Sequence, residues 1–174
     1  MKSLSSIDSY LGFGSIFKEC KNEKTGRINW SKVANYENLP AAFIDKYYCM
    51  LKPFNIEDKQ TFPEWLIEKK RHKVNWMLLI RSEKNNVDEA LVSKCIDALS
   101  SRSILFFVLK RIKLSLAFFE KNWEHVLAVP QYKSCILNNI SIDPIEISKI
   151  ISFLEEKEHE LQAQRSCLHA QREA

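Results

Sequence analysis

Hydrophobic residues recur at every third or fourth position along most of this 174-residue chain, with polar residues between them. This spacing is typical of a helix that buries one face, and it recurs in about eight segments. The short apolar run ILFFVL fits either a strand or a buried helix. Three glycines and five prolines are few for the many tight turns of a β-sandwich or barrel. The sequence therefore predicts an all-α protein.

Three short helices are predicted near the N-terminus, at residues 7–21, 30–36 and 40–52. Pro40 suits the first turn of the third helix, where the missing N–H has no intrahelical partner in any case. Each large aromatic side chain can bury on the order of 150–250 Å², so few of them fill a small core. We therefore interpret the following aromatic residues as core: Trp30, Phe43, Tyr47 and Trp65.

Further helices are predicted from start signals and apolar stripes. A helix is predicted at 62–70, and the pattern also allows this helix to continue as far as Arg81. Asn86 and Glu89 have the spacing of a capping box, which places a helix start at Asn86. The segment 104–119 is apolar nearly all round, so we expect it to be one central buried helix.

The last predicted helix has the clearest start. Asp143 is suited to the N-cap, Pro144 to the first helical position, and Glu146 to the first turn. An apolar stripe follows, and the polar end of this segment is either a projecting helix or a frayed tail. Coiled-coil pairing there has few heptads to support it.

The polar stretch SEKNN, residues 82–86, is the predicted boundary between two parts. Residues 1–82 would form a helical module with a basic extension. Residues 86–174 would form a helical bundle, free to pack on the first part. The triplets Ile28-Asn29-Trp30 and Val74-Asn75-Trp76 echo each other, but so short a match is interpreted as coincidence.

Positive charge is concentrated in the N-terminal part, although the net charge of the chain is only +4. Residues 1–75 contain 13 Lys and Arg against 9 Asp and Glu, whereas the remainder is balanced. The densest cluster is KKRHK, which begins with Lys69, Lys70 and Arg71. Such a cluster fits a nuclear-import signal, a phosphate-binding patch or the solvated end of a helix.

Enzymatic, metal-binding and membrane classes are not indicated. The histidines lie in separate segments, and neither HExxH nor a serine-elbow pattern occurs. The five cysteines are widely spaced without CxxC, so we expect reduced, mostly buried thiols and no cofactor. The apolar run 104–119 contains three cations, which argues against a membrane span of roughly 20 residues. The first residues lack the pattern of a signal peptide.

Residues 7–70 resemble a degenerate Myb/SANT repeat. The resemblance rests on Asn29-Trp30 with Val33-Ala34, on Lys46-Tyr47-Tyr48 with Leu51-Lys52, and on Phe62-Pro63. It is most similar to the last Myb-like repeat of the RNA polymerase I transcription termination factors and of the cyclin-D-binding Myb-like factors.

The resemblance implies a three-helix DNA-binding module in a nuclear, or even nucleolar, protein of transcription regulation or termination. It would place Ala42 and Asp45 on the outer face of the recognition helix. It would also direct a set of cations at phosphates: Arg27, Lys32, Lys46 and Lys52. A single repeat with so few cations is expected to bind duplex DNA or chromatin weakly, because affinity depends on phosphate neutralisation.

An alternative from a different class remains open. The chain would then be an all-helical adaptor without a nucleic-acid role, holding a partner helix in an apolar groove. Phe106, Phe107 and Phe118 are the candidate lining of that groove. In either case the C-terminal helices are expected to offer a surface to a protein partner.

Overall fold

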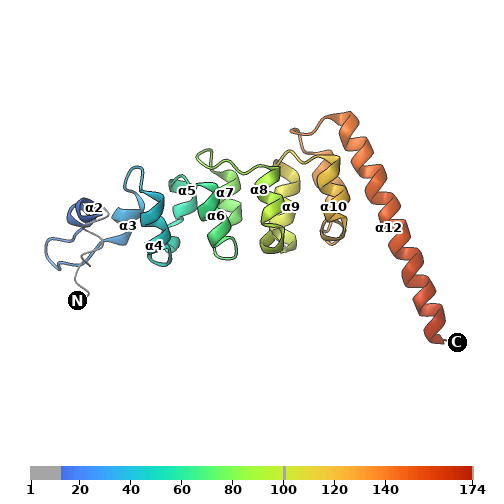
Figure 1. Ribbon diagram of the computed structural model, residues 1–174, viewed down its shortest axis with the longest axis horizontal. Coiled ribbons are helices and arrows are strands. Elements are labelled where there is room, and N and C mark those ends of the chain that lie inside the picture. Colours follow the sequence, from blue (N-terminus) through green and yellow to red (C-terminus); the bar gives the residue numbers. More distant parts are fainter. Residues whose placement is uncertain (1–12, 100, 174) are drawn as a thin grey trace. The chain divides into compact units, whose positions relative to one another are not determined.

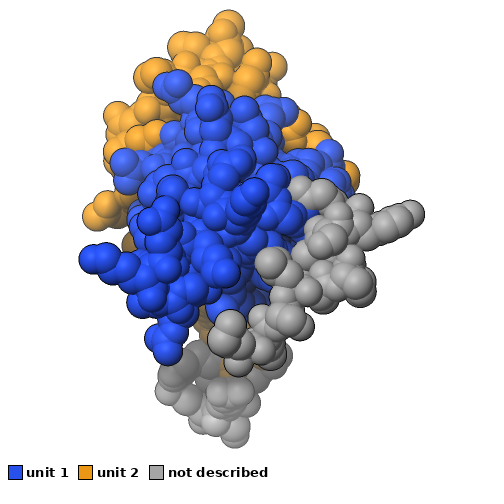
Figure 2. Space-filling view, turned by 90° about the vertical axis from the view of Figure 1, so that its left-hand side faces the viewer, with its two compact units in different colours: residues 1–86 blue, residues 87–174 orange. Residues whose placement is uncertain are grey.

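The computed structural model describes residues 13–99 and 101–173, and every named element that they form is a helix (Figure 1). The only pairing of extended backbone in these residues is an isolated bridge between Lys21 and Ile28. The all-α prediction is confirmed. The chain divides into two compact units, Met1–Asn86 (unit 1) and Val87–Ala174 (unit 2), which are coloured separately in Figure 2.

Unit 1 is built from short helices joined by tight turns. Its elements are α2 (Gly14–Glu19), α3 (Trp30–Ala34), α4 (Ala41–Leu51), the 3₁₀ turn η1 (Lys52–Phe54), α5 (Ile56–Lys59), α6 (Glu64–Lys70) and α7 (Trp76–Arg81). The predicted helix 7–21 is observed from Gly14 only, and its first part lies outside the described residues. The short helix α5 was not predicted.

An aromatic cluster joins α2, α3 and α4. The rings of Phe17, Phe43 and Tyr47 lie 4.8–5.4 Å apart between centroids. Trp30 meets both Phe17 and Tyr47, at 6.1 and 5.6 Å. Edge-on and tilted contacts of this kind add to the free energy gained by burying the rings. The core prediction is therefore confirmed for Phe43, which is fully buried, whereas Trp30 and Tyr47 are half-buried members of the cluster.

The core interpretation of Trp65 is wrong, because 48% of this residue is exposed. Leu66 and Ile67 form the buried face of α6, which turns the preceding residue outward. The fully buried tryptophan of unit 1 is instead Trp76, which is 1% exposed. Its indole Nε1 donates a hydrogen bond to the backbone oxygen of Arg71 over 2.9 Å.

Helices α6 and α7 are separate, so the option of one continuous helix from 62 to 81 is wrong. Asn75 interrupts the helix and caps α7, accepting a hydrogen bond from Leu78 N–H. Asn29 caps α3 in the same way, through Lys32 N–H. The φ and ψ angles of the two asparagines agree within a degree, at −86° and 94° for Asn75 and −87° and 95° for Asn29. The echoed triplets thus share a local role as helix starts.

Buried polar side chains organise the turns around α5. The side chain of Gln60 accepts from Leu39 N–H over 2.9 Å and donates to the backbone oxygen of Tyr36 over 2.6 Å. Asn85 accepts from Phe62 N–H over 2.7 Å and donates to the backbone oxygen of Glu57. Because these backbone groups are buried away from water, each would lose stability if left without its partner.

Unit 2 contains longer helices. Its elements are α8 (Glu89–Lys94), η2 (Ile96–Leu99), α9 (Arg102–Arg111), α10 (Leu116–Leu127), α11 (Tyr132–Leu137) and α12 (Pro144–Glu173). The predicted start at Asn86 is wrong, because Asp88 is the N-cap of α8 and accepts from Leu91 N–H. The carboxylate of Asp88 thereby satisfies a free backbone N–H of the first turn over 2.9 Å.

The predicted single helix at 104–119 is also wrong, since the chain breaks between α9 and α10. Ser115 caps α10, and the carboxylate of Glu89 accepts hydrogen bonds from both the N–H and the hydroxyl of Ser115. Asn139 donates to the last carbonyls of α9, at Leu109 and Ile112. Two side chains from elsewhere in the unit therefore satisfy the free backbone groups at this break.

Helix α12 begins as predicted at Pro144, and Asp143 accepts from Ile145 N–H over 2.8 Å. Its first half packs on α10 and α11, with Ile150 and Leu154 fully buried. The residues from Gln162 to Leu168 are exposed but remain helical. The polar end of this segment is therefore a projecting helix and not a frayed tail.

Candidate nucleic-acid interface

The KKRHK cluster is attached to α4 through Asp45. Lys69 Nζ lies 2.6 Å from one carboxylate oxygen of Asp45, and Lys70 Nζ lies 2.8 Å from the other. Lys70 also donates to the backbone oxygen of Asp45 over 3.1 Å. These hydrogen bonds, from Lys69 first and Lys70 second, lower the pKa of Asp45 below its ordinary value. Both oxygens of Asp45 are thus occupied by lysines of α6, so Asp45 links the end of α6 to α4.

Exposed positions on α4 continue this surface. Lys46 follows Asp45, and its ammonium lies 5.3 Å from the centre of the Tyr47 ring. Ala42 is exposed one turn before Lys46. Lys52 is exposed at the start of η1, about two turns after Asp45. We call the surface formed by Ala42, Asp45, Lys46, Lys52, Lys69 and Lys70 the α4–α6 face.

The backbone that follows α6 is held in place by a buried tyrosine. The hydroxyl of Tyr48 lies 3.1 Å from the backbone oxygen of Lys73 and makes a short hydrogen bond to the carboxylate of Glu57. Burial, and then this carboxylate, raise the pKa of Tyr48 above its ordinary value. The backbone oxygen of Arg71 accepts from Trp76. The residues after α6 therefore have a defined path, and Lys73 itself is exposed.

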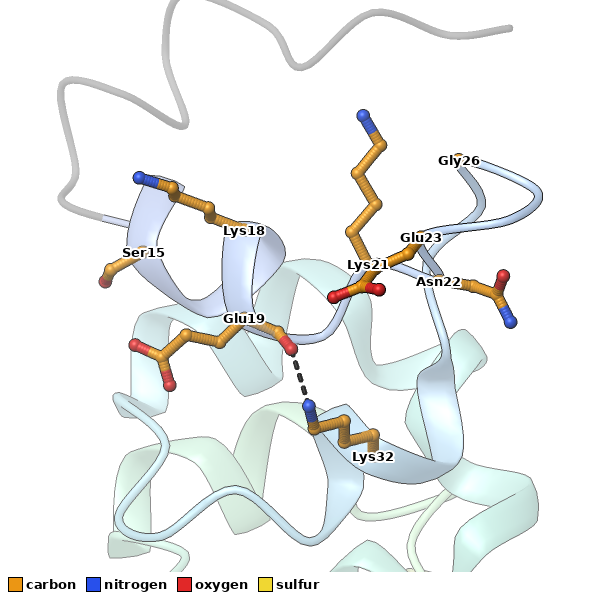
Figure 3. Close-up of a pocket in the computed structure, with 8 residues that line it drawn as sticks. All are labelled: Ser15, Lys18, Glu19, Lys21, Asn22, Glu23, Gly26 and Lys32. Carbon is orange, nitrogen blue, oxygen red and sulfur yellow. Dashed lines mark hydrogen bonds between the residues drawn. The ribbon is translucent and has the colours of Figure 1, made fainter.

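Two other predicted phosphate-binding cations, Lys32 and Arg27, are not part of the α4–α6 face. Lys32 on α3 donates to the backbone oxygen of Glu19, at the end of α2, over 2.7 Å (Figure 3). Arg27 is exposed in the loop between α2 and α3, directly after Gly26, whose φ of 68° favours glycine. The structure thus brings Lys69 and Lys70 to Asp45, which is the sequence neighbour of Lys46. Lys32 instead donates to the end of α2.

Lys32 also lines a surface depression of about 840 Å³ beside this loop. Its lining is drawn in Figure 3: Ser15, Lys18, Glu19, Lys21, Asn22, Glu23, Gly26 and Lys32. Two carboxylates accompany its three lysines and offset most of their charge. This depression is therefore a poorer polyanion site than the α4–α6 face, where four lysines accompany the carboxylate of Asp45.

Trp65 was not among the predicted site residues, because the sequence pattern was interpreted as placing it in the core. It lies four residues before Lys69 in α6, so the two side chains are neighbours on one side of the helix. The apolar residues of α6, Trp65, Leu66 and Ile67, span less than one helical turn. The sequence alone did not reveal whether Trp65 or the adjacent Leu66 faces inward.

The aromatic residues proposed for an adaptor groove are partly enclosed. Phe118 is 2% exposed and packs edge-on against Phe119, with ring centres 5.6 Å apart. Phe106 and Phe107 are half-buried, and the guanidinium of Arg111 lies 4.8 Å from the centre of the Phe107 ring. Phe118 is thus not available to line an open groove.

Within the described residues, no helix has both the length and the apolar character to cross a membrane. The same residues contain no group of three or more His, Cys, Asp or Glu arranged to hold a metal ion. Comparisons of the chain with protein-family models, with curated proteins and with solved structures found no match.

Proposed function

We propose that unit 1 binds DNA or chromatin weakly, through the α4–α6 face, in a protein of the nucleus. The observation that supports this proposal most strongly is the double ion pair at Asp45. It joins the basic end of α6 to the helix that the Myb/SANT resemblance makes the recognition helix. Lysines that were distant in the sequence thereby form one positively charged surface.

The chemistry of this face fits phosphate binding better than base reading. The four lysines of the face outnumber its one carboxylate, Asp45, so the face attracts a polyanion. Ala42 offers no hydrogen-bonding group to a base edge, and the oxygens of Asp45 are already occupied. We therefore expect binding that depends strongly on salt and little on DNA sequence.

The test is a charge reversal on the exposed lysines of this face, Lys46→Glu with Lys52→Glu. The matched control is Lys113→Glu with Lys121→Glu, which changes the charge equally at exposed positions of unit 2. Binding of the full chain to a fluorescent duplex DNA is followed by anisotropy at 50 mM salt, and circular dichroism checks helicity.

We expect the first pair to weaken binding by at least about tenfold and the control pair to have a smaller effect, because phosphate contacts act locally. Equal losses in the two double variants would mean that only total charge matters. Unchanged binding after the first pair would remove α4 from the interface.

A further inference from the structure

Five helices of the chain share one pattern of residues. They are α4, α6, α8, α10 and α12, and each is preceded in the chain by another helix, from α3 to α11. Their starts lie 23–28 residues apart, which is a period typical of helical repeat proteins. Counted from these starts, eleven residues align without a gap: AAFIDKYYCML (41–51), EWLIEKKRHKV (64–74), EALVSKCIDAL (89–99), LAFFEKNWEHV (116–126) and PIEISKIISFL (144–154). We number the resulting helix pairs repeats 1 to 5.

Equivalent positions of the five segments are buried or exposed alike. The third and fourth positions are buried in repeats 1 to 4 and half-buried in repeat 5, whose terminal place makes it atypical. The eleventh position is buried in all five: Leu51, Val74, Leu99, Val126 and Leu154. The second position is exposed in all five and is occupied by Trp65 in repeat 2, so the outward direction of Trp65 belongs to the repeated pattern. The sixth position is an exposed lysine each time: Lys46, Lys69, Lys94, Lys121 and Lys149.

The backbone geometry repeats as well. At the seventh position the chain leaves the helical φ and ψ region in repeats 1, 3 and 4, with nearly equal angles: −108° and 16° at Tyr47, −111° and 14° at Cys95, and −121° and 17° at Asn122. The asparagine caps of α3 and α7, with their matching angles, start the first helices of repeats 1 and 3. The echoed triplets thereby become part of the same repetition.

Buried amide side chains join neighbouring repeats at equivalent places. Gln60 in repeat 2 accepts a hydrogen bond from Leu39 N–H in repeat 1. Asn85 in repeat 3 accepts one from Phe62 N–H in repeat 2. Each amide lies four residues before the start of its second helix, and each bonded N–H lies two residues before the previous start. The same bond therefore links repeat 1 to repeat 2 and repeat 2 to repeat 3.

Whole helices pack in the same order. Within unit 1, α5 packs on α7, and within unit 2, α9 packs on α11 and α10 packs on α12. First helices thus contact first helices, and second helices contact second helices, in neighbouring repeats. Repeat arrays pack in this way because no single repeat buries its apolar face alone.

We infer that the chain is an array of five repeats of one helix pair, and that each repeat opens with its nearest neighbours and not with the whole of its compact unit. The stability of an array is close to a sum of terms for each repeat and for each interface with the next. A substitution in the core of one repeat therefore destabilises that repeat most, its neighbours less, and more distant repeats hardly at all. The inference is independent of the proposed function, because it concerns no ligand.

Two buried leucines of unit 2 allow a matched test. Leu99 in repeat 3 and Leu154 in repeat 5 are both fully buried at the eleventh position. The variants Leu99→Ala and Leu154→Ala are made in the full chain, with Ser152→Ala as a control at an exposed position of repeat 5. Amide hydrogen exchange, followed by mass spectrometry of peptides, measures the protection of each helix separately.

We expect the two leucine variants to give opposite patterns. Leu99→Ala should speed exchange in α8 by about 30-fold or more, the effect of a cavity in a packed core, and should leave α12 unchanged. Leu154→Ala should speed exchange in α11 and the first half of α12 by a similar factor and leave α8 unchanged. Helices α9 and α10 belong to repeat 4, which adjoins both sites, so they should respond to each variant by a smaller factor. Ser152→Ala should leave every helix as it is in the unchanged protein.

Equal acceleration of α8, α10 and α12 by either leucine variant would overturn the inference, because unit 2 would then open as one body. An effect confined to the substituted repeat, with α9 and α10 unchanged, would contradict the coupling between neighbours. Where an alanine variant does not fold, Leu99→Val and Leu154→Val remove less volume and give the same comparison with smaller factors.

Discussion

Replacing Asp45 by asparagine should strengthen DNA binding while slightly weakening the fold. The carboxylate neutralises part of the charge of Lys69 and Lys70, which lie 2.6 and 2.8 Å from its oxygens. Asparagine has nearly the same shape but no charge. The variant Asp45→Asn therefore frees positive charge on the α4–α6 face without removing a side chain.

The substitution should change the DNA affinity and the folding stability by separate amounts. If the freed charge neutralises one more phosphate, the log–log salt dependence steepens by about 0.9, and affinity at 50 mM salt rises by about tenfold. The cost in stability is the loss of two partly exposed ion pairs, since Lys69 is 57% exposed and Asp45 is 21% exposed. Such pairs contribute up to about 1 kcal/mol together.

The assay is anisotropy with a labelled duplex from 50 to 300 mM salt, paired with urea unfolding. Asp58→Asn is the control, because Asp58 is an exposed carboxylate on α5 of the same unit. It should shift affinity less than Asp45→Asn does. Weaker or unchanged binding of Asp45→Asn, with the fold intact, would show that the freed lysines do not face DNA.

Three further predictions concern stability and are tested by urea or thermal unfolding. Gln60→Leu should cost about 2–4 kcal/mol, because the buried N–H of Leu39 and the partly buried backbone oxygen of Tyr36 lose their partners; a loss below 1 kcal/mol would contradict this. Trp76→Ala should cost about 3–5 kcal/mol, whereas Trp65→Ala should cost far less, and the reverse order would contradict the burial of Trp76. Because the pKa of Asp45 is lowered in the folded state, its stabilisation is fully present above its ordinary pKa of 3.8 and is lost as the pH falls through the lower folded value. The stability difference between the unchanged protein and Asp45→Asn should thus vanish under strongly acidic conditions, and a difference that persists there would contradict this account.

The helical class and several helix starts were predictable because their signals are local. Asp143 before Pro144 carries its own capping chemistry, and α12 begins where the sequence places it. The breaks at Asn75 and Ser115 were missed for the opposite reason. A polar N-cap inside an apolar run becomes visible only when distant groups, such as Glu89 at Ser115, complete the turn.

The candidate site was predictable in its composition but not in its assembly. The basic run 69–73 and the cations of residues 40–52 are evident in the sequence. Their association depends on Asp45, which the resemblance placed on the outer face of the recognition helix and which pairs there with Lys69 and Lys70. The direction of Trp65 depends on which neighbours α6 packs against, and this is a tertiary effect that periodicity over one turn does not capture.

Binding of the full chain to duplex DNA across a salt series tests the central claim most directly. The four lysines of the α4–α6 face should give weak binding whose log–log slope is about −3 to −4, because each neutralised phosphate contributes roughly 0.9. No binding at low salt, or binding that does not change with salt, would contradict a phosphate-contacting surface on unit 1.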